Sequence, residues 1–210
     1  MITFLYFDFN FWRVDVPRLC LSFANIQHRL KSISRADFII QKKRGAFPFG
    51  QLPVMIVNKN MYGQTIAISK YCASLASLYS ENKDECLIID QVLSWANDIN
   101  SKIAPSIREK NKVKQIKLRN KFVRNDLVTW FNYLERIYEK RVGNENFFLK
   151  KFSLADITAW RIIHWFKSGK LDLVNPDFLR KFRKLNTFYE SVNKYDAFNK
   201  IKLYQEIITK

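Results

Sequence analysis

The sequence is poor in the residues that interrupt or cross-link a fold. Its 210 residues include only five glycines and five prolines, which argues against a disordered chain and against a β-rich sandwich. Because 48% of the residues are hydrophobic, the chain can fill the core of one large domain or two small ones. Cys20, Cys72 and Cys86 contain no Cys-x-x-Cys pair and leave one cysteine unmatched. We therefore expect reduced thiols in a cytoplasmic protein.

Histidines and long apolar runs are also scarce. His28 and His164 are too few and too far apart to suggest a metal site, so no metal is predicted. No apolar run approaches the ~20 residues that a membrane-spanning helix needs. The opening stretch "MITFLYFDFNFW" lacks a basic head and a small-residue cleavage site. It predicts a buried strand and not a signal peptide.

Acidic residues are outnumbered by basic ones. The chain has 36 Lys and Arg against 19 Asp and Glu, a formal net charge of +17. The excess is spread over both halves, but Lys102 to Arg124 contains nine basic residues and the single acid Glu109. Such a stripe could meet an acidic macromolecular partner such as RNA, an anionic membrane or an acidic protein. The alternative is an ordinary solvated helix face.

The first third of the chain alternates between strand and helix patterns. "ITFLYF" predicts a buried strand, and Val16 to Phe23 has helical spacing, with Pro17 expected in the first turn. A second strand is expected over His28–Ile33, a third over "PVMIV" and a short fourth over "MYG". A helix beginning at Gln64 would close a small α/β unit of residues 1–78.

The rest of the chain has a different pattern. The polar stretch "SLYSENKDE" is the natural boundary, and beyond it apolar residues repeat at helical spacing throughout residues 85–210. Ser153 followed by Asp156 has the spacing of a helix-capping pair. The predicted fold class is therefore an α/β domain followed by an all-helical domain.

Two places in the first unit are suited to hold a small anionic peptide. Pro53 could form a cis bond and turn the chain, which would leave the N–H and C=O of Leu52 free for an extended ligand. Gln64 and Thr65 lie at a helix start, where free N–H groups and the helix dipole favour an anion.

With these residues in view, the chain resembles the cytosolic glutathione transferases, most closely their sigma-like branch. Four motifs carry the resemblance in the right order over nearly the whole chain: Tyr6-Phe7, "FPFGQLPV", "GQTIAISKY" and "FSLADITAW". The resemblance implies a thioredoxin-like N-terminal domain, an all-helical C-terminal domain, a cis Pro53 and glutathione as co-substrate. It implies that Tyr6 stabilises the glutathione thiolate, assisted by Arg13. The implied glutathione-binding residues are Tyr6, Phe38, Lys43, Arg44, Gln51, Leu52, Pro53, Gln64, Thr65 and Asp98.

Some of these implied residues depart from the family pattern. The Tyr6–Arg13 loop is one residue longer than usual and carries Phe11 and Trp12 where a glycine is normal. Phe38 replaces a tryptophan that donates to glutathione, so one hydrogen bond should be missing. The segment before Pro48 is also longer, so the basic ligand could be Lys42, Lys43 or Arg44. Phe9, Phe11 and Trp12 are expected to form the pocket for the electrophile.

Two functions follow from this comparison. The first is a cytoplasmic, homodimeric transferase that conjugates glutathione to small hydrophobic electrophiles, with Asp98 reaching the glutathione amine in the partner subunit. The second is a non-catalytic, transferase-like assembly subunit whose basic surface binds RNA, tubulin or a larger complex.

Overall fold

The computed structural model describes residues 1–140 and 146–209, which form two compact units. The first unit comprises residues 1–80 together with 196–210, and the second comprises residues 81–195. The predicted division into 1–78 and 85–210 differs mainly in the last fifteen residues. Helix α10 (Lys202–Thr209) packs against α1 (Trp12–Phe23) of the first unit and buries Leu203, Tyr204 and Ile207.

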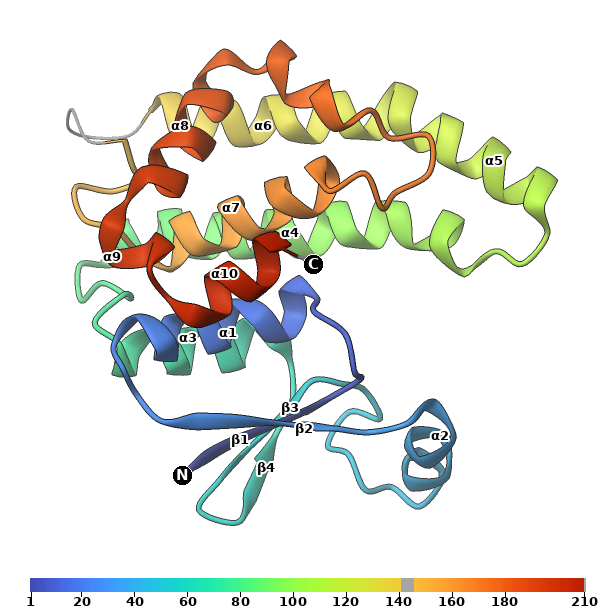
Figure 1. Cartoon of the computed structure of the whole chain (residues 1–210), viewed down its shortest axis with the longest axis vertical. Coiled ribbons are helices and arrows are strands. Elements are labelled where there is room, and N and C mark those ends of the chain that lie inside the picture. Colours follow the sequence, from blue (N-terminus) through green and yellow to red (C-terminus); the bar gives the residue numbers. More distant parts are fainter. Residues whose placement is uncertain (141–145, 210) are drawn as a thin grey trace. The chain divides into compact units, whose positions relative to one another are not determined.

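The first unit is built on a mixed sheet of four strands. Strands β1 (Ile2–Tyr6), β2 (His28–Ser32), β3 (Val54–Val57) and β4 (Asn60–Tyr62) follow the order β2-β1-β3-β4. β1 runs parallel to β2 and antiparallel to β3, and all its residues are buried because it is central. Helices α1 and α3 (Thr65–Leu75) pack together on one side of the sheet (Figure 1). The predicted α/β architecture is confirmed.

Two local predictions about this unit were wrong. Helix α2 (Arg35–Lys43) was not foreseen, and none of its residues is buried. Of its residues Phe38 alone is packed on the described core cluster, so the helix shows no helical periodicity of apolar residues in the sequence. Helix α1 begins at Trp12, so Pro17 lies in the second turn and not in the first. The complete burial of neighbours such as Val14, Val16 and Leu19 stabilises the helix despite the missing hydrogen bond.

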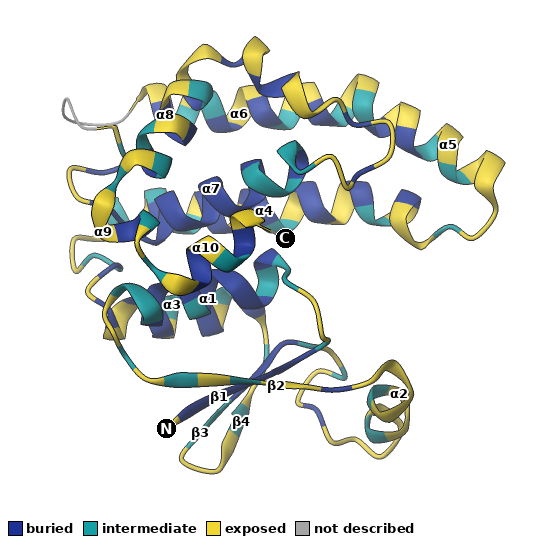
Figure 2. Ribbon diagram, in the orientation of Figure 1, coloured by how far each residue is buried: buried dark blue, intermediate teal, exposed yellow. Residues whose placement is uncertain are grey.

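The second unit is helical, as predicted. Its elements are α4 (Lys83–Arg108), α5 (Lys112–Lys121), a π-helical turn η1 (Phe122–Leu127), α6 (Val128–Glu139), α7 (Leu154–Lys167), the 3₁₀ helix η2 (Pro176–Lys181) and α8 (Arg183–Lys194). A short α9 (Asp196–Asn199) precedes α10 in the first unit. Figure 2 shows α7 almost entirely buried and α5 largely exposed. Phe131 packs edge-on against Phe178, with ring centroids 4.8 Å apart, at the centre of this core.

Within the described residues no helix is long and apolar enough to cross a membrane.

Candidate functional site

The strand register brings several predicted residues to one edge of the sheet. Tyr6 pairs with Ser32 in the parallel ladder between β1 and β2. Extending the antiparallel register of Leu5 with Val54 by one residue puts Tyr6 opposite Pro53. Extending the pairing of Met55 with Tyr62 by two residues puts Pro53 opposite Gln64. Continued past the paired residues, this register aligns Tyr6, Pro53 and Gln64 across the sheet, with Gln64 two residues beyond the end of β4.

Tyr6 ends the central strand with its side chain only 5% exposed. Within the described chain its hydroxyl has no hydrogen-bond partner. Burial raises the pKa of Tyr6 far above its ordinary value; Arg13 opposes this effect and Asp15 adds to it. The side chain is therefore a neutral phenol at physiological pH, able to donate its proton in a hydrogen bond.

The acid–base pair on α1 was not singled out as part of the site from the sequence. Asp15 is fully buried, and its Oδ1 lies 3.9 Å from a guanidinium nitrogen of Arg18. Burial lowers the pKa of Arg18, while Asp15 and Glu206 raise it. The signal in the sequence was the spacing of Asp15 and Arg18, because an acid three residues before an arginine shares its helix face.

Aromatic side chains surround Tyr6. Its ring makes edge contacts with Phe7 and Phe9, with centroids 5.5 and 5.6 Å apart, and Phe9 contacts Phe11 at 6.3 Å. Phe9 is exposed and Phe11 half-buried, so both offer apolar surface beside the phenol. Trp12 is fully buried, with the Arg13 guanidinium 4.8 Å from its ring centre. Trp12 therefore contributes packing and not accessible pocket surface, which differs from the expectation.

Phe38 also faces the interior of the first unit. Its ring contacts Phe7 at 5.4 Å and Phe47 at 5.5 Å, and it packs on the cluster that includes Leu5 and Val54. It has no polar atom to donate to a ligand. Its position is explained by packing between α2 and the sheet.

The turn before β3 has the geometry that the sequence suggested. The Leu52–Pro53 peptide bond is cis. Among the described residues, the N–H and C=O of Leu52 take part in no backbone hydrogen bond, so both are available to an extended ligand. Gln51 is exposed beside them.

The three basic candidates on α2 are not equivalent. The Lys42 side chain runs alongside Gly50, where a Cβ would lie 3.3 Å from the Lys42 Cε atom, and its Nζ lies 5.9 Å from the centre of the Phe38 ring. Lys43 is exposed at the helix end, and Arg44 is the exposed residue that follows. Lys42 is therefore the candidate whose position next to Gln51 is fixed by contacts.

Helix α3 begins at Thr65 with its first N–H groups uncapped by a side chain. The preceding Gln64 is exposed and has φ 72°, a left-handed conformation that a residue other than glycine adopts at a cost of roughly 1–3 kcal/mol. Thr65 is buried directly after it. An exposed amide side chain and the N–H groups of a helix start are donors of the kind that a carboxylate accepts from.

Asp98 belongs to the other unit. It lies on α4 with its side chain exposed, between the buried residues Ala96 and Ile99. It points away from the core of its own unit, as a residue that reaches an external ligand must. No group of three or more His, Cys, Asp or Glu side chains in the described ranges could hold a metal ion.

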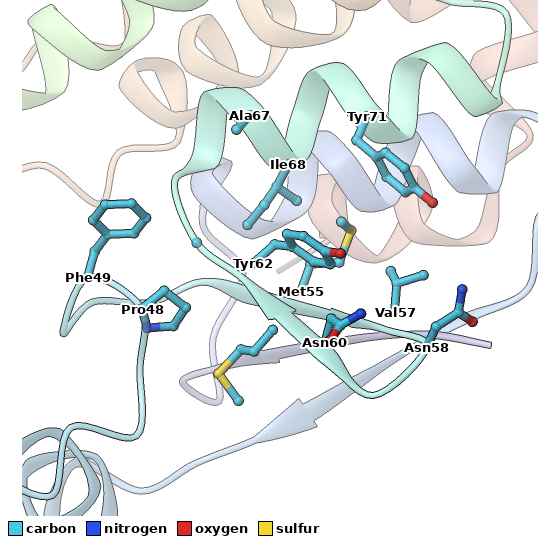
Figure 3. A pocket seen from close by; sticks show the side chains of 12 residues that line it. Pro48, Phe49, Met55, Val57, Asn58, Asn60, Tyr62, Ala67, Ile68 and Tyr71 are labelled. Carbon is cyan, nitrogen blue, oxygen red and sulfur yellow. The ribbon is translucent and has the colours of Figure 1, made fainter.

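A separate apolar pocket of about 400 Å³ lies on the first unit (Figure 3). Its walls come from β3, β4 and α3, with Phe49 at one side and Tyr62 and Tyr71 at the rim. Gly63 leaves room for the Phe49 ring, because a Cβ there would lie 2.8 Å from the ring. None of the predicted site residues lines this pocket.

Several proteins of known family are similar in sequence to this chain. The family model described as "Glutathione S-transferase, C-terminal domain" matches residues 97–206, which is 110 of the 210 residues. A glutathione S-transferase of Anopheles gambiae is 28% identical over 182 residues, 86% of this chain and 82% of that protein. The hematopoietic prostaglandin D synthase of Rattus norvegicus is 24% identical over 195 residues, 92% of this chain and 90% of that protein.

Solved structures agree on the fold. A sigma class glutathione transferase of Fasciola hepatica superposes with a TM-score of 0.80 at 18% identity, covering all of this chain and 97% of that one. A prostaglandin synthase D of Nilaparvata lugens gives 0.79 at 22% identity over 95% of both chains. Together with the family model that covers more than half of the sequence, these similarities establish that the chain belongs to the glutathione S-transferase family.

Proposed function

We propose that this protein is a glutathione transferase in which Tyr6 activates the thiol of glutathione for transfer to small hydrophobic electrophiles. The observation that carries the proposal is the register of the paired strands β1, β3 and β4, which lead toward Tyr6, Pro53 and Gln64 at one end of the sheet. One bound tripeptide would then meet three groups: the phenol donor, the free backbone segment at Leu52 and the anion site at the start of α3.

The chemistry follows from the protonation state of Tyr6. A free thiol has a pKa near ~8.5, so little thiolate forms at neutral pH. A neutral phenol that donates to the sulfur stabilises the thiolate and so lowers the thiol pKa. Each pKa unit of lowering corresponds to about 1.4 kcal/mol in favour of the thiolate. The thiol proton leaves to solvent. The sulfur then attacks an electrophilic carbon, a new S–C bond forms and the leaving group departs with its electron pair.

The remaining binding residues have separate roles in this proposal. Leu52 pairs with the cysteinyl backbone, while Gln64 and Thr65 bind the γ-glutamyl carboxylate. Gln51 and a cation bind the other carboxylate. Of Lys42, Lys43 and Arg44 we favour Lys42, because its side chain lies along Gly50. Phe9 and Phe11 form the wall for the electrophile, supported by their exposure beside Tyr6.

A homodimer is the second part of the proposal. Phe49 is 60% exposed at the apolar pocket, where Tyr62 and Tyr71 are also exposed. Leu75, one helical turn after Tyr71 on α3, is exposed too. A second copy of the chain would cover this surface, and Asp98 of that copy would supply a carboxylate for the glutathione amine. Phe49→Ser should shift the sedimentation coefficient from dimer to monomer. Ile39→Ser, a matched change of an exposed residue on α2, should not. A wild-type monomer at every protein concentration would contradict this part.

We also assign the protein to the cytoplasm, where its free thiols Cys20, Cys72 and Cys86 and its co-substrate would stay reduced.

The test of catalysis is binding to immobilised glutathione followed by conjugation to a chlorinated nitrobenzene. Tyr6→Phe keeps the ring and removes only the donor. It should lower kcat 10- to 100-fold, or about 1.4–2.8 kcal/mol, with little change in glutathione affinity. Tyr133→Phe, the same change at an exposed tyrosine of α6, serves as control. Unchanged kcat in Tyr6→Phe would show that another group activates the sulfur. Absence of both glutathione binding and turnover in the wild type would favour the non-catalytic alternative.

A further inference from the structure

The end of the α4–α5 hairpin carries a group of exposed cations, which we call the basic tip. Its members are exposed Lys and Arg side chains around the connection Glu109–Asn111 and along α5: Arg108, Lys110, Lys114, Lys117 and Lys121. In the part of the chain that the structure describes, none of the five pairs with a carboxylate. By contrast, Lys102 binds Asp126 at 3.1 Å and Lys112 binds Asp172 at 3.3 Å. Figure 2 shows α5 as a mainly exposed helix.

The only acid of this stretch does not neutralise the basic tip. Glu109 is half-buried, and its Oε1 accepts a hydrogen bond from the N–H of Asn111 at 2.8 Å. This bond, together with the Asn111 side chain that caps α5 through the N–H of Lys114, fixes the turn. The acid therefore shapes the connection, and its single negative charge offsets only one of the five cations.

Aliphatic side chains are exposed among these cations. Val113 is 77% exposed, as much as any large hydrophobic residue that the structure describes. Ile107 is 45% and Ile116 40% exposed. Ile116 also borders a hollow of about 360 Å³ together with Leu173, which is 51% exposed. The tip thus combines exposed aliphatic side chains with exposed positive charges along the same stretch of chain.

The orientation of α5 is set by its opposite face. Arg119 is buried, and its guanidinium donates to the Ser106 hydroxyl of α4 at 2.7 Å and to the carbonyl oxygen of Asp172 at 2.8 Å. Ile116 is three residues before Arg119 and shares its side of the helix, where both border the hollow. Val113 and Lys117, four residues apart, lie together on the side away from this anchor. Their outward position is therefore a fixed property of the second unit.

We propose that the basic tip is a docking surface for an anionic phospholipid membrane. Lysines at headgroup level are attracted to the negative leaflet, while exposed aliphatic side chains enter the boundary with the acyl chains. The tip has no aromatic residue between Lys102 and Lys121 on which a nucleic acid base could stack, which argues against RNA. Val113, at 77% exposed, is more accessible than a residue that lines a groove for a peptide helix. This inference does not depend on the proposed catalytic function.

The experiment is co-sedimentation with two kinds of vesicle, phosphatidylcholine alone and phosphatidylcholine with 30% phosphatidylserine, from 0.05 to 0.5 M salt. The full chain should bind the anionic vesicles, and this binding should weaken steeply as the salt concentration rises. The triple variant K110Q/K114Q/K117Q should lose roughly ten-fold or more in partition coefficient. Its matched control K181Q/K184Q/K194Q removes the same charge from exposed lysines of the same unit and should stay within about two-fold.

A second pair of variants separates membrane binding from simple charge attraction. Val113→Gln should weaken vesicle binding several-fold, because the side chain no longer enters the apolar boundary. Leu87→Gln, at a residue that is 63% exposed on the first turns of α4, should have no effect. Circular dichroism and melting temperature check the fold of each variant, and Lys114→Gln replaces the triple variant if that one fails to fold.

Three results would overturn the proposal. The first is equal binding to vesicles with and without phosphatidylserine. The second is an equal loss in the two triple variants. The third is a Val113→Gln protein that binds vesicles like wild type while single-stranded RNA or polyglutamate competes fully, which would assign the tip to an acidic macromolecule.

Discussion

Removal of the Asp156 carboxylate should destabilise the protein far more than loss of an ordinary helix cap. Asp156 is fully buried at the start of α7. Its Oδ1 accepts the N–H of Phe148, and its Oδ2 accepts both the N–H and the hydroxyl of Ser153, each at 2.8 Å. The carboxylate therefore holds the loop from Phe148 to Ser153 onto the helix as well as capping it.

The magnitude follows from those bonds. A cap alone is worth about 0.5–2 kcal/mol. Asp156→Ala would also leave the buried N–H groups of Phe148 and Ser153 without an acceptor, at about 1–3 kcal/mol each. We expect a loss of about 3–5 kcal/mol, which for a chain of this size lowers Tm by roughly 10 °C. Asp84→Ala, an exposed acid in the first turn of α4, should cost no more than about 1 kcal/mol.

The loss can be located by hydrogen exchange. In Asp156→Ala the amides of Phe148 and Ser153 should exchange much faster, while those of the sheet in the first unit should not. Conjugation rates in the folded fraction should stay near wild type. A variant as stable as Asp84→Ala, or one in which those two amides remain protected, would refute the reasoning.

The stabilising effect of Asp156 should depend on pH. Burial raises the pKa of this carboxyl to about 7, although the hydrogen bonds from Phe148 and Ser153 oppose the shift. Between the ordinary value and 7 the folded chain binds more protons than the unfolded one, so stability falls as pH rises through this window. The stability advantage of wild type over Asp156→Asn should shrink by up to about 1.4 kcal/mol per pH unit from pH 5 to 7. Urea denaturation of both proteins at several pH values measures it, and a constant difference would contradict the raised pKa.

Three further predictions concern the glutathione site. Asp98→Asn should weaken glutathione binding about ten-fold or more with the fold intact, since a charge-assisted hydrogen bond is worth about 1.5–3 kcal/mol. Titration calorimetry measures the affinity, and an unchanged value would remove Asp98 from the site. Lys42→Ala should weaken glutathione binding several-fold whereas Lys43→Ala should not, and the reverse order would reassign the basic ligand. Gln64→Gly should raise the unfolding free energy by about 1 kcal/mol by relieving the left-handed backbone, yet weaken glutathione binding; a lower Tm would show that Gln64 is not strained.

The sequence predicted the features that local periodicity and spacing encode. The four strands, the start of α3 and the Ser153–Asp156 pair follow from such patterns. Helix α2 was missed because none of its residues is fully buried and only Phe38 packs on the described core cluster, so no periodic apolar face marks it. The pattern at Ser153 and Asp156 also gave no sign that Phe148 would share the carboxylate, since that bond depends on how a loop folds back.

The positions of the site side chains were harder to predict than the helices and strands. The Pro53 turn and its free Leu52 backbone agree with the expectation from the sequence. Burial of Trp12 could not be read from its neighbours, because an aromatic residue at a loop end can face either the core or solvent. The distinction between Lys42 and Lys43 likewise depends on the path of the loop around Gly50, which only the three-dimensional structure supplies.

The packing of α10 on α1 also has a consequence for the order of folding. The first unit contains the sheet with Tyr6, yet it is complete only when residues 196–210 join it. During synthesis the whole second unit emerges from the ribosome before that segment does. Closing so large a loop costs chain entropy, so the last step of assembly in the first unit should be slow and should follow folding of the second. A nascent chain arrested before residue 196 would therefore expose the apolar surface of α1 that Leu203, Tyr204 and Ile207 normally cover.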